Sequence, residues 1–243
     1  MSQKLTRRHF LNSAILAAGS AAVAQAATKP GSAPAPEVPA GKIKIIALNG
    51  SPRKDKTTVA ALTVAIEAAK AVAPDRIEVE LVHLVDYNLL SSARVLGELA
   101  VPANGKTDFV KLEEKLSAPE VRGLLVGSPV HNSSPSSLAA LFFGQVRHGK
   151  DKNGHPILEG KPAGALAVGG ARNGGQENVV NGINTYFFHE KMILVGADSG
   201  RVGALLWNQK DSIDADEFGK KLAVGLGQRV ARAALSIPTN LFA

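Results

Sequence analysis

Cysteine is absent from this 243-residue chain, and aromatic residues make up only 5% of it. Without thiols the chain can form no disulfide, no thiolate metal site and no iron–sulfur cluster, and it has no cysteine nucleophile. Hydrophobic residues make up 45% of the chain and charged residues 20%. This composition excludes a disordered chain, a collagen-like fibre and a coiled coil, and it is typical of one globular domain.

A large excess of one charge sign is also lacking. Lys and Arg number 28 and Asp and Glu 21, so the formal charge is 28 − 21 = +7. Lys4, Arg7 and Arg8 are the only formal charges in residues 1–26, and the rest of the chain carries 25 − 21 = +4. A balance of this size favours neither nucleic acid nor an anionic membrane as a partner.

Residues 1–26 have the layout of a bacterial export signal. A basic stretch precedes an alanine-rich apolar run that ends in Ala24-Gln25-Ala26, a small-residue cleavage site. The segment TRRHFL at 6–11 resembles the twin-arginine consensus, which implies export of a folded protein. We expect cleavage near Ala26 and a periplasmic or otherwise exported protein with no stable membrane insertion after processing.

The alternative to a cleaved signal is a retained membrane anchor, because residues 9–28 carry no formal charge. Polar residues dilute this run, and alanine contributes little to insertion, so the cleaved signal is favoured. Residues 27–41, rich in proline and alanine, predict a flexible linker. The folded domain is then expected to span residues 42–243.

The domain alternates predicted strands and helices. Runs typical of strands occupy residues 43–48, 76–83, 121–126, 162–168 and 192–195. Apolar residues at helical spacing occupy residues 57–73, 108–116, 136–144, 176–191 and 214–236. This order predicts an α/β fold, with a parallel sheet covered by helices on both faces. Ligands of such sheets bind beyond the carboxyl ends of the strands.

The loops richest in glycine, serine and proline follow the first, third and fourth predicted strands, at 49–58, 127–135 and 169–177. In a parallel sheet all three open on one edge. Glycine and serine also punctuate strand ends without binding anything. Three such loops on one edge, each followed by a helix, favour a shared ligand.

The first of these loops suits a phosphate monoester. It leads into a helix N-terminus, where free backbone N–H groups and the helix dipole attract an anion. The hydroxyls of Ser51, Thr57 and Thr58 add donors, and Arg53 and Lys56 add positive charge.

The same loop nearly matches the phosphate loop of nucleoside triphosphate hydrolases and kinases. That motif requires glycine immediately before its Lys-Thr pair, where this chain has Asp55. An acidic side chain there also repels phosphates, so a kinase or ATPase is rejected.

The three loops together resemble a known family. LNGSPRKDKTT at 48–58 is similar to the phosphate loop of the flavodoxin-like NAD(P)H-dependent FMN reductases. GSPVHNSSP at 127–135 resembles that family's GSPVY segment, which lies against the flavin ring. GGARNGGQE at 169–177 resembles its GG-x-R-x-GGQE segment, which wraps the far side of the ring. The resemblance covers roughly residues 42–200, in the family's order and spacing.

The resemblance implies a flavodoxin-like three-layer sandwich with a doubly wound, five-stranded parallel sheet, and FMN as the cofactor. It implies that the phosphate is held by Ser51, Arg53, Lys56, Thr57 and Thr58. It implies that the ring lies between Pro129, Val130, His131 and Asn132 on one side and, on the other, Gly170, Ala171, Arg172, Gly174, Gly175 and Gln176. Since the flavin carries the redox chemistry, no catalytic side chain is expected.

Some residues depart from the family pattern. His131 stands where the family usually has tyrosine, and Lys56-Thr57 replaces a small residue followed by asparagine. One branch of the family carries a cysteine cluster for an iron–sulfur centre after the second strand, and this chain has no cysteine. No metal site is expected either: the six histidines lack ligand spacing, and the Lys- and Gly-rich stretch 146–160 is typical of a solvated loop.

We therefore expect an FMN-dependent oxidoreductase that passes hydride or electrons from NAD(P)H, or another donor, to a quinone, nitro or metal acceptor. An exported protein meets little NAD(P)H, so a membrane quinol or a partner redox protein stays open as the donor. Two alternatives stay open: an FMN-binding electron-transfer protein without its own substrate, and a non-redox exported module that binds a phosphate-bearing ligand. The resemblance also implies a homo-oligomer, either a dimer or a tetramer.

Overall fold

A computed structural model of the chain describes residues 40–89, 94–95, 98–99, 108–146, 149–151 and 154–238. These residues belong to one unit, Glu37–Ala243. The predicted signal and all but the last two residues of the predicted linker lie outside the described residues.

The centre of the fold is a parallel sheet. Its strand order is β2 (Ile77–His83), β1 (Ile43–Asn49), β5 (Val121–Pro129), β6 (Pro162–Gly169) and β7 (Ile193–Leu194), with β8 (Ala204–Trp207) also paired to β6. This is the 2-1-3-4-5 order of flavodoxin-like folds, with the fifth position shared by two short strands. The predicted fold class is confirmed.

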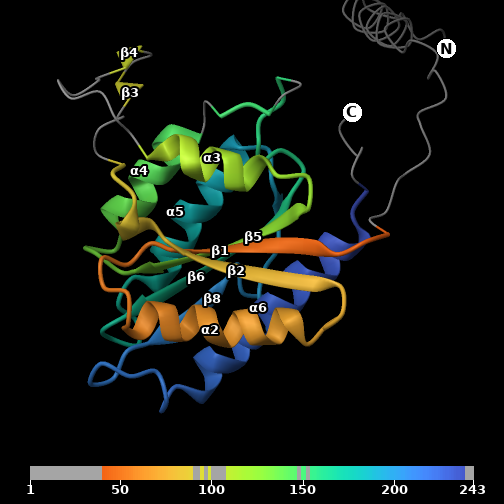
Figure 1. Cartoon of the computed structure of the whole chain (residues 1–243). Coiled ribbons are helices and arrows are strands. Elements are labelled where there is room, and N and C mark those ends of the chain that lie inside the picture. Colours follow the sequence, from red (N-terminus) through yellow and green to blue (C-terminus); the bar gives the residue numbers. More distant parts are fainter. Residues whose placement is uncertain are drawn as a thin grey trace, which may run out of the picture. The chain divides into compact units, whose positions relative to one another are not determined.

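Helices cover both faces of the sheet (Figure 1). One face carries α2 (Thr57–Lys70) and α6 (Glu217–Ser236), and the other carries α3 (Phe109–Ser117), α4 (Ser137–Val146) and α5 (Gln176–His189). The structure also contains a short 3-10 helix, Leu84–Asp86, and a small antiparallel pair, β3 (Arg94–Val95) with β4 (Glu98–Leu99).

Strand β1 shows why both faces need a cover. Ile43, Ile45 and Ala47 pack against α2 and α6, whereas Ile46 and Leu48 pack into the cluster on the opposite face. Side chains of a strand alternate between faces, so an apolar run without polar interruptions must be buried on both sides. The apolar sequence of β1 therefore determines its central place.

The fifth strand position differs from the sequence prediction. The predicted strand 192–195 is reduced to Ile193–Leu194, and β8, which the sequence analysis did not predict, pairs with the other end of β6. Between them the chain leaves the sheet through a turn at Ser199 and Gly200, both with positive φ. The loop that follows β8 lies at the carboxyl edge of the sheet, and the sequence analysis did not consider it.

Two helix boundaries differ from the prediction by three residues, and the others by at most two. The predicted helix 57–73 ends at Lys70, and the predicted helix 214–236 begins at Glu217. Asp216 sets the second boundary, because its Oδ1 accepts a hydrogen bond of 3.1 Å from the backbone N–H of Gly219.

The expectation of a solvated loop at 146–160 is wrong for its second half. Ile157 and Leu158 are buried in the cluster that α3 and α4 cover, and the Lys161 ammonium donates to the Leu116 carbonyl at 2.5 Å.

Among the described residues, no helix combines the length and apolar character that a membrane span requires.

Candidate functional site

The carboxyl edge of the sheet brings the three glycine-rich loops together. β1 and β5 are neighbours, and the register places Asn49 beside Gly127 where the first and second loops begin. β5 and β6 are neighbours in turn, with Pro129 beside Val168. The chain departs from β1 and β5 in opposite directions across the sheet, which is the switch point where ligands of this topology bind.

The first loop is shaped by its own side chains. Asn49, which is fully buried, accepts the Ser51 N–H at its Oδ1 at 3.0 Å, and its Nδ2 lies 3.0 Å from Nδ1 of His83. Ser51 is also buried, and its Oγ accepts the Arg53 N–H at 3.1 Å. Such side chain to backbone bonds hold a tight turn without regular structure. The sequence analysis gave no role to Asn49 or His83, because their contact crosses from β1 to β2.

Ser136 ties the first loop to the second. Its Oγ donates to the Gly50 carbonyl at 2.6 Å and accepts the Ala139 N–H at 3.2 Å. Gly50 also donates its N–H to the Gly127 carbonyl at 2.8 Å, and a Cβ on Gly50 would meet that oxygen at 3.0 Å. A side chain at position 50 would therefore be crowded by the close approach of the two loops. Ser136 was not among the predicted site residues, although serine at the start of a helix is a common cap.

Helix α2 begins in this loop with an uncapped N-terminus. Lys56 occupies the N-cap position with no side-chain hydrogen bond, and the first turn contains no acidic residue. Thr57 and Thr58 are buried in that first turn. The positive end of the helix dipole and the first-turn N–H groups are thus left to a ligand or solvent.

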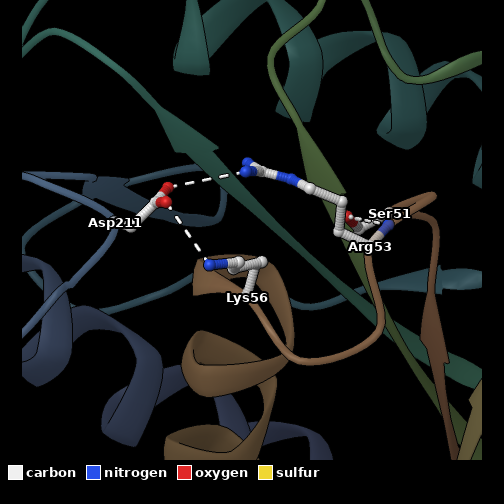
Figure 2. A network of polar contacts seen from close by, with 4 residues as sticks. All are labelled: Ser51, Arg53, Lys56 and Asp211. Atoms are coloured by element: carbon white, nitrogen blue, oxygen red, sulfur yellow. Dashed lines mark hydrogen bonds and ion pairs between the residues drawn. The ribbon is translucent and has the colours of Figure 1, made fainter.

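A carboxylate from a distant part of the chain faces the two cations of this loop. Asp211, in the connection after β8, lies 3.5 Å from Nη1 of Arg53 and 3.4 Å from Nζ of Lys56, each measured to one carboxylate oxygen (Figure 2). All three side chains are about half exposed. Asp211 was not predicted as a site residue, because its loop follows the strand that the sequence analysis missed.

The second loop forms a tight turn above β5. Val130 donates its N–H to the Val168 carbonyl at 3.0 Å, and His131 and Ser134 exchange backbone hydrogen bonds of 3.1 and 2.9 Å. Asn132 and Ser133 form the tip with φ of 50° and 58°. Pro129 and Val130 are half-buried, whereas His131 and Asn132 are exposed.

The third loop is held from behind by Gln176. The buried Gln176 amide accepts the Gly174 N–H at 2.8 Å and donates to the carbonyls of Ala171, at 2.6 Å, and Leu206, at 3.2 Å. Gln176 was predicted to contact the cofactor, and in the structure its amide fixes the shape of the loop. Gly170 and Ala171 are exposed on that loop.

Gly175 brings the second and third loops into contact. It has φ of +96°, and a Cβ there would lie 2.5 Å from Oγ of Ser133. Both its conformation and its close approach therefore require glycine.

Arg172 lies against Trp207 of β8. Its guanidinium carbon is 4.9 Å from the indole centroid, and the Trp207 Nε1–H donates to the Gly170 carbonyl at 3.4 Å. Beside this pair is a cavity of about 450 Å³, lined also by Phe218 and by the ion pair of Arg201 with Glu177. This cavity adjoins the third loop and mixes aromatic with charged groups.

A buried lysine with a strongly lowered pKa lies at the opposite, amino-terminal edge of the sheet. Burial, with the positive charge of Arg122, lowers the pKa of Lys161 to about 8. Among the residues that the structure describes, no cluster of three or more histidine, aspartate or glutamate side chains is placed to hold a metal ion.

The structure thus places every predicted site residue in the strand ends, loops or helix starts of one sheet edge. They are Ser51, Arg53, Lys56, Thr57, Thr58, Pro129, Val130, His131, Asn132, Gly170, Ala171, Arg172, Gly174, Gly175 and Gln176.

Comparison with known proteins adds a family and relatives. The sequence model of the family described as NADPH-dependent FMN reductase matches residues 43–202. An iron–sulfur flavoprotein of Methanosarcina thermophila is 32% identical over 193 residues, covering 74% of this chain and 93% of the relative. Another, of Methanocaldococcus jannaschii, is 28% identical over 199 residues, covering 78% and 96%.

Solved structures share the fold at low identity. RosB with a bound 8-demethyl-8-formylriboflavin-5'-phosphate aligns with a TM-score of 0.60 at 17% identity, covering 79% of each chain. The flavoenzyme NAD(P)H:(acceptor) oxidoreductase FerB of Paracoccus denitrificans aligns with a TM-score of 0.51 at 14% identity, covering 79% of this chain and 98% of FerB.

Proposed function

The chain belongs to the NADPH-dependent FMN reductase family, whose members are FMN-dependent oxidoreductases, and we propose that it carries electrons from a donor to a small acceptor through FMN held at the carboxyl edge of its sheet. The observation that carries this proposal is the first loop. There an uncapped helix N-terminus lies beside two cations, Arg53 and Lys56, in the setting that a phosphate monoester requires.

The residues present fit the phosphate end of FMN. The N-terminus of α2 offers backbone N–H groups that no side chain caps. Ser51 and the Asn49 turn hold the backbone of the loop in place, and Ser136 ties it to the second loop. Thr57 and Thr58 lie in the first turn of α2, so their hydroxyls belong to the same short segment as the uncapped backbone N–H groups.

The residues also fit the ring end. The second loop (127–135) and the third loop (169–177) approach each other where Ser133 meets Gly175, and this contact leaves no room for a side chain at Gly175. Gln176 fixes the third loop through three hydrogen bonds. Loops held in this way present their backbone dipoles without reorganisation, as electrostatic stabilisation of a charged ring requires.

When bound, FMN supplies the hydride and electron transfer. The chain's own residues bind the phosphate, orient the ring between two loops and keep the third loop rigid. We place Arg172 beside Trp207 as a positive charge near the ring end, and His131 at the exposed side where the family usually has tyrosine.

The donor and the acceptor form the finer part of the proposal. The family description supports NADPH as donor, and a membrane quinol or partner redox protein is the alternative for an exported protein. The acceptor is a quinone, nitro compound or metal ion. The curated relatives are called iron–sulfur flavoproteins, but this chain has no cysteine to ligate a cluster. We therefore propose that FMN is the sole redox centre held by this chain.

Export and assembly complete the proposal. We propose that the twin-arginine segment at 6–11 directs export, with cleavage near Ala26 and a periplasmic product. We also propose a homo-oligomer, a dimer or tetramer, which sedimentation of the purified protein tests directly.

The test of the cofactor is an absorption spectrum of the gently purified protein, with and without added FMN. Flavin bands that shift or quench on binding, followed by rapid reduction with NADPH or NADH, are the expected result. Binding without turnover by any donor and acceptor pair indicates an electron carrier instead. A colourless protein that ignores FMN refutes the proposal.

A glycine pair provides a matched variant test. Gly175→Val should abolish FMN retention, because its Cβ overlaps Ser133. Gly200→Val is the control, since Gly200 has φ of +68° but open space around it, so it carries the strain without the overlap. Full FMN occupancy in a folded Gly175→Val protein would remove the third loop from the site.

A further inference from the structure

Asp211 stands on a tight, hydrogen-bonded turn, and its carboxylate faces the first loop. Gln209 and Ser212 exchange backbone hydrogen bonds of 2.7 and 3.0 Å, and the two residues between them form the tip. Lys210 and Asp211 have φ of 52° and 61°, the left-handed region that this two-residue turn requires. Aspartate tolerates that region better than most residues, so the turn and the acidic side chain are compatible.

The carboxylate contacts both cations that serve the proposed phosphate position. One oxygen lies 3.5 Å from Nη1 of Arg53, and the other lies 3.4 Å from Nζ of Lys56 (Figure 2). Together the three side chains carry a net charge of one positive unit instead of two. A phosphate monoester carries about −1.5 to −2 at pH 7, so it competes with Asp211 for the same two partners.

Phosphate wins this competition, but displacing Asp211 reduces its net binding free energy. The side chains of Arg53, Lys56 and Asp211 are 55%, 44% and 51% exposed, so each ion pair is screened by solvent. Exposed ion pairs of this kind change an equilibrium constant by about fivefold at most. A phosphate that also binds the α2 N-terminus can therefore displace the carboxylate, at the expense of part of its own binding free energy.

We propose that Asp211 weakens the hold of this protein on the flavin phosphate and thereby keeps its FMN exchangeable. The proposal rests on the proposed function, because it concerns the phosphate end of the same site. It assigns to the connection after β8 a negative role in cofactor affinity, through a carboxylate that contacts both cations of the first loop.

The test compares Asp211→Asn with Asp214→Asn. Asp214 lies three residues further along the same connection, and no ion pair among the described residues joins it to Arg53 or Lys56. Both variants lose one negative charge, so only a specific contact distinguishes them. Each variant and the unchanged protein are titrated with FMN and with riboflavin, which lacks the phosphate.

We expect Asp211→Asn to bind FMN about 3- to 10-fold more tightly, from the loss of two exposed ion pairs. Its affinity for riboflavin and both affinities of Asp214→Asn should change less than twofold. Unchanged or weaker FMN binding by Asp211→Asn would overturn the inference, and so would an equal gain for riboflavin.

Inorganic phosphate separates this inference from the proposed function. Thermal unfolding in increasing phosphate should show tighter phosphate binding by Asp211→Asn than by the unchanged protein, whether or not flavin binds. A gain for phosphate in a protein that ignores FMN would retain the role of Asp211 and refute the flavin assignment. Equal phosphate affinities would overturn the inference alone.

Discussion

Replacing Ser136 with alanine tests how the first loop, the proposed phosphate site, is held. Ser136 is 1% exposed, its Oγ donates to the Gly50 carbonyl at 2.6 Å, and the same oxygen accepts the Ala139 N–H at 3.2 Å. Alanine removes both bonds but retains the bond of 2.9 Å from the Ser136 N–H to Oγ of Ser128. The substitution therefore removes the side-chain bond between the two loops, while the backbone bond from Gly50 to Gly127 and the Ser136 N–H bond to Ser128 remain.

The magnitude follows from these two bonds. Loss of a helix N-cap costs about 1 kcal/mol. Leaving a buried carbonyl without its partner costs about 1–3 kcal/mol. The Gly50 N–H bond to Gly127 still joins the two loops, and we expect a total loss of about 2–3 kcal/mol in the free energy of unfolding. Because the lost bond to the Gly50 carbonyl also loosens the loop that leads into α2, the Kd for FMN should rise about tenfold.

Urea unfolding of the flavin-free protein measures the first effect, and an FMN titration measures the second. The urea midpoint should fall while the slope stays the same, because the unfolded surface does not change. Ser137→Ala is the control: Ser137 is adjacent but exposed, and its loss should change stability by less than about 0.5 kcal/mol. A Ser136→Ala protein as stable as the control would refute the tether, and a destabilised protein with unchanged FMN affinity would refute its link to the site.

Three further predictions concern other parts of the chain. Since burial lowers the pKa of Lys161 from 10.5 to about 8, the unfolded state binds more protons between those pH values, and stability should rise with pH across that window. Lys161→Met should therefore raise the free energy of unfolding by on the order of 2–3 kcal/mol at pH 7, and this gain should shrink above pH 8. The exposed control Lys191→Met should show no such gain. Urea unfolding at pH 7 and pH 10 tests this prediction, and an equal gain at both pH values contradicts it. Gln176→Ala should raise the Kd for FMN at least about tenfold in a fluorescence titration, because three hydrogen bonds that shape the third loop are lost. If the exposed control Asn178→Ala has as large an effect, the Gln176 hydrogen bonds do not hold the loop for FMN binding. Conversion of both Arg7 and Arg8 to lysine keeps their charge and should leave uncleaved precursor in the cytoplasm on fractionation; normal export would show that another route is used.

Most of the fold could be predicted from local patterns. The apolar runs of β1, β5 and β6 are long enough to identify buried strands, and the helices between them have clear apolar faces. The fifth strand was predicted at 192–195, where β7 is shorter, but β8 was not predicted, because a strand of four residues is too short to show a period. The stretch after Val146 was misjudged because its charged and glycine residues outnumber Ile157 and Leu158, which are nonetheless buried.

The sequence by itself determined the order of strands and helices, the three glycine-rich loops and their position on one edge. The reason is that periodicity and turn residues are local properties, and parallel strands necessarily end on the same side. Only the tertiary structure decided which side chains meet across those loops. Ser136 on Gly50, Asp211 on Arg53 and Lys56, and Arg172 on Trp207 join segments that are far apart in the chain, and their contacts depend on strand order and register. Long-range contacts of this kind leave no periodic signal along the sequence, so the balance of charges around the first loop emerges only when the chain is folded.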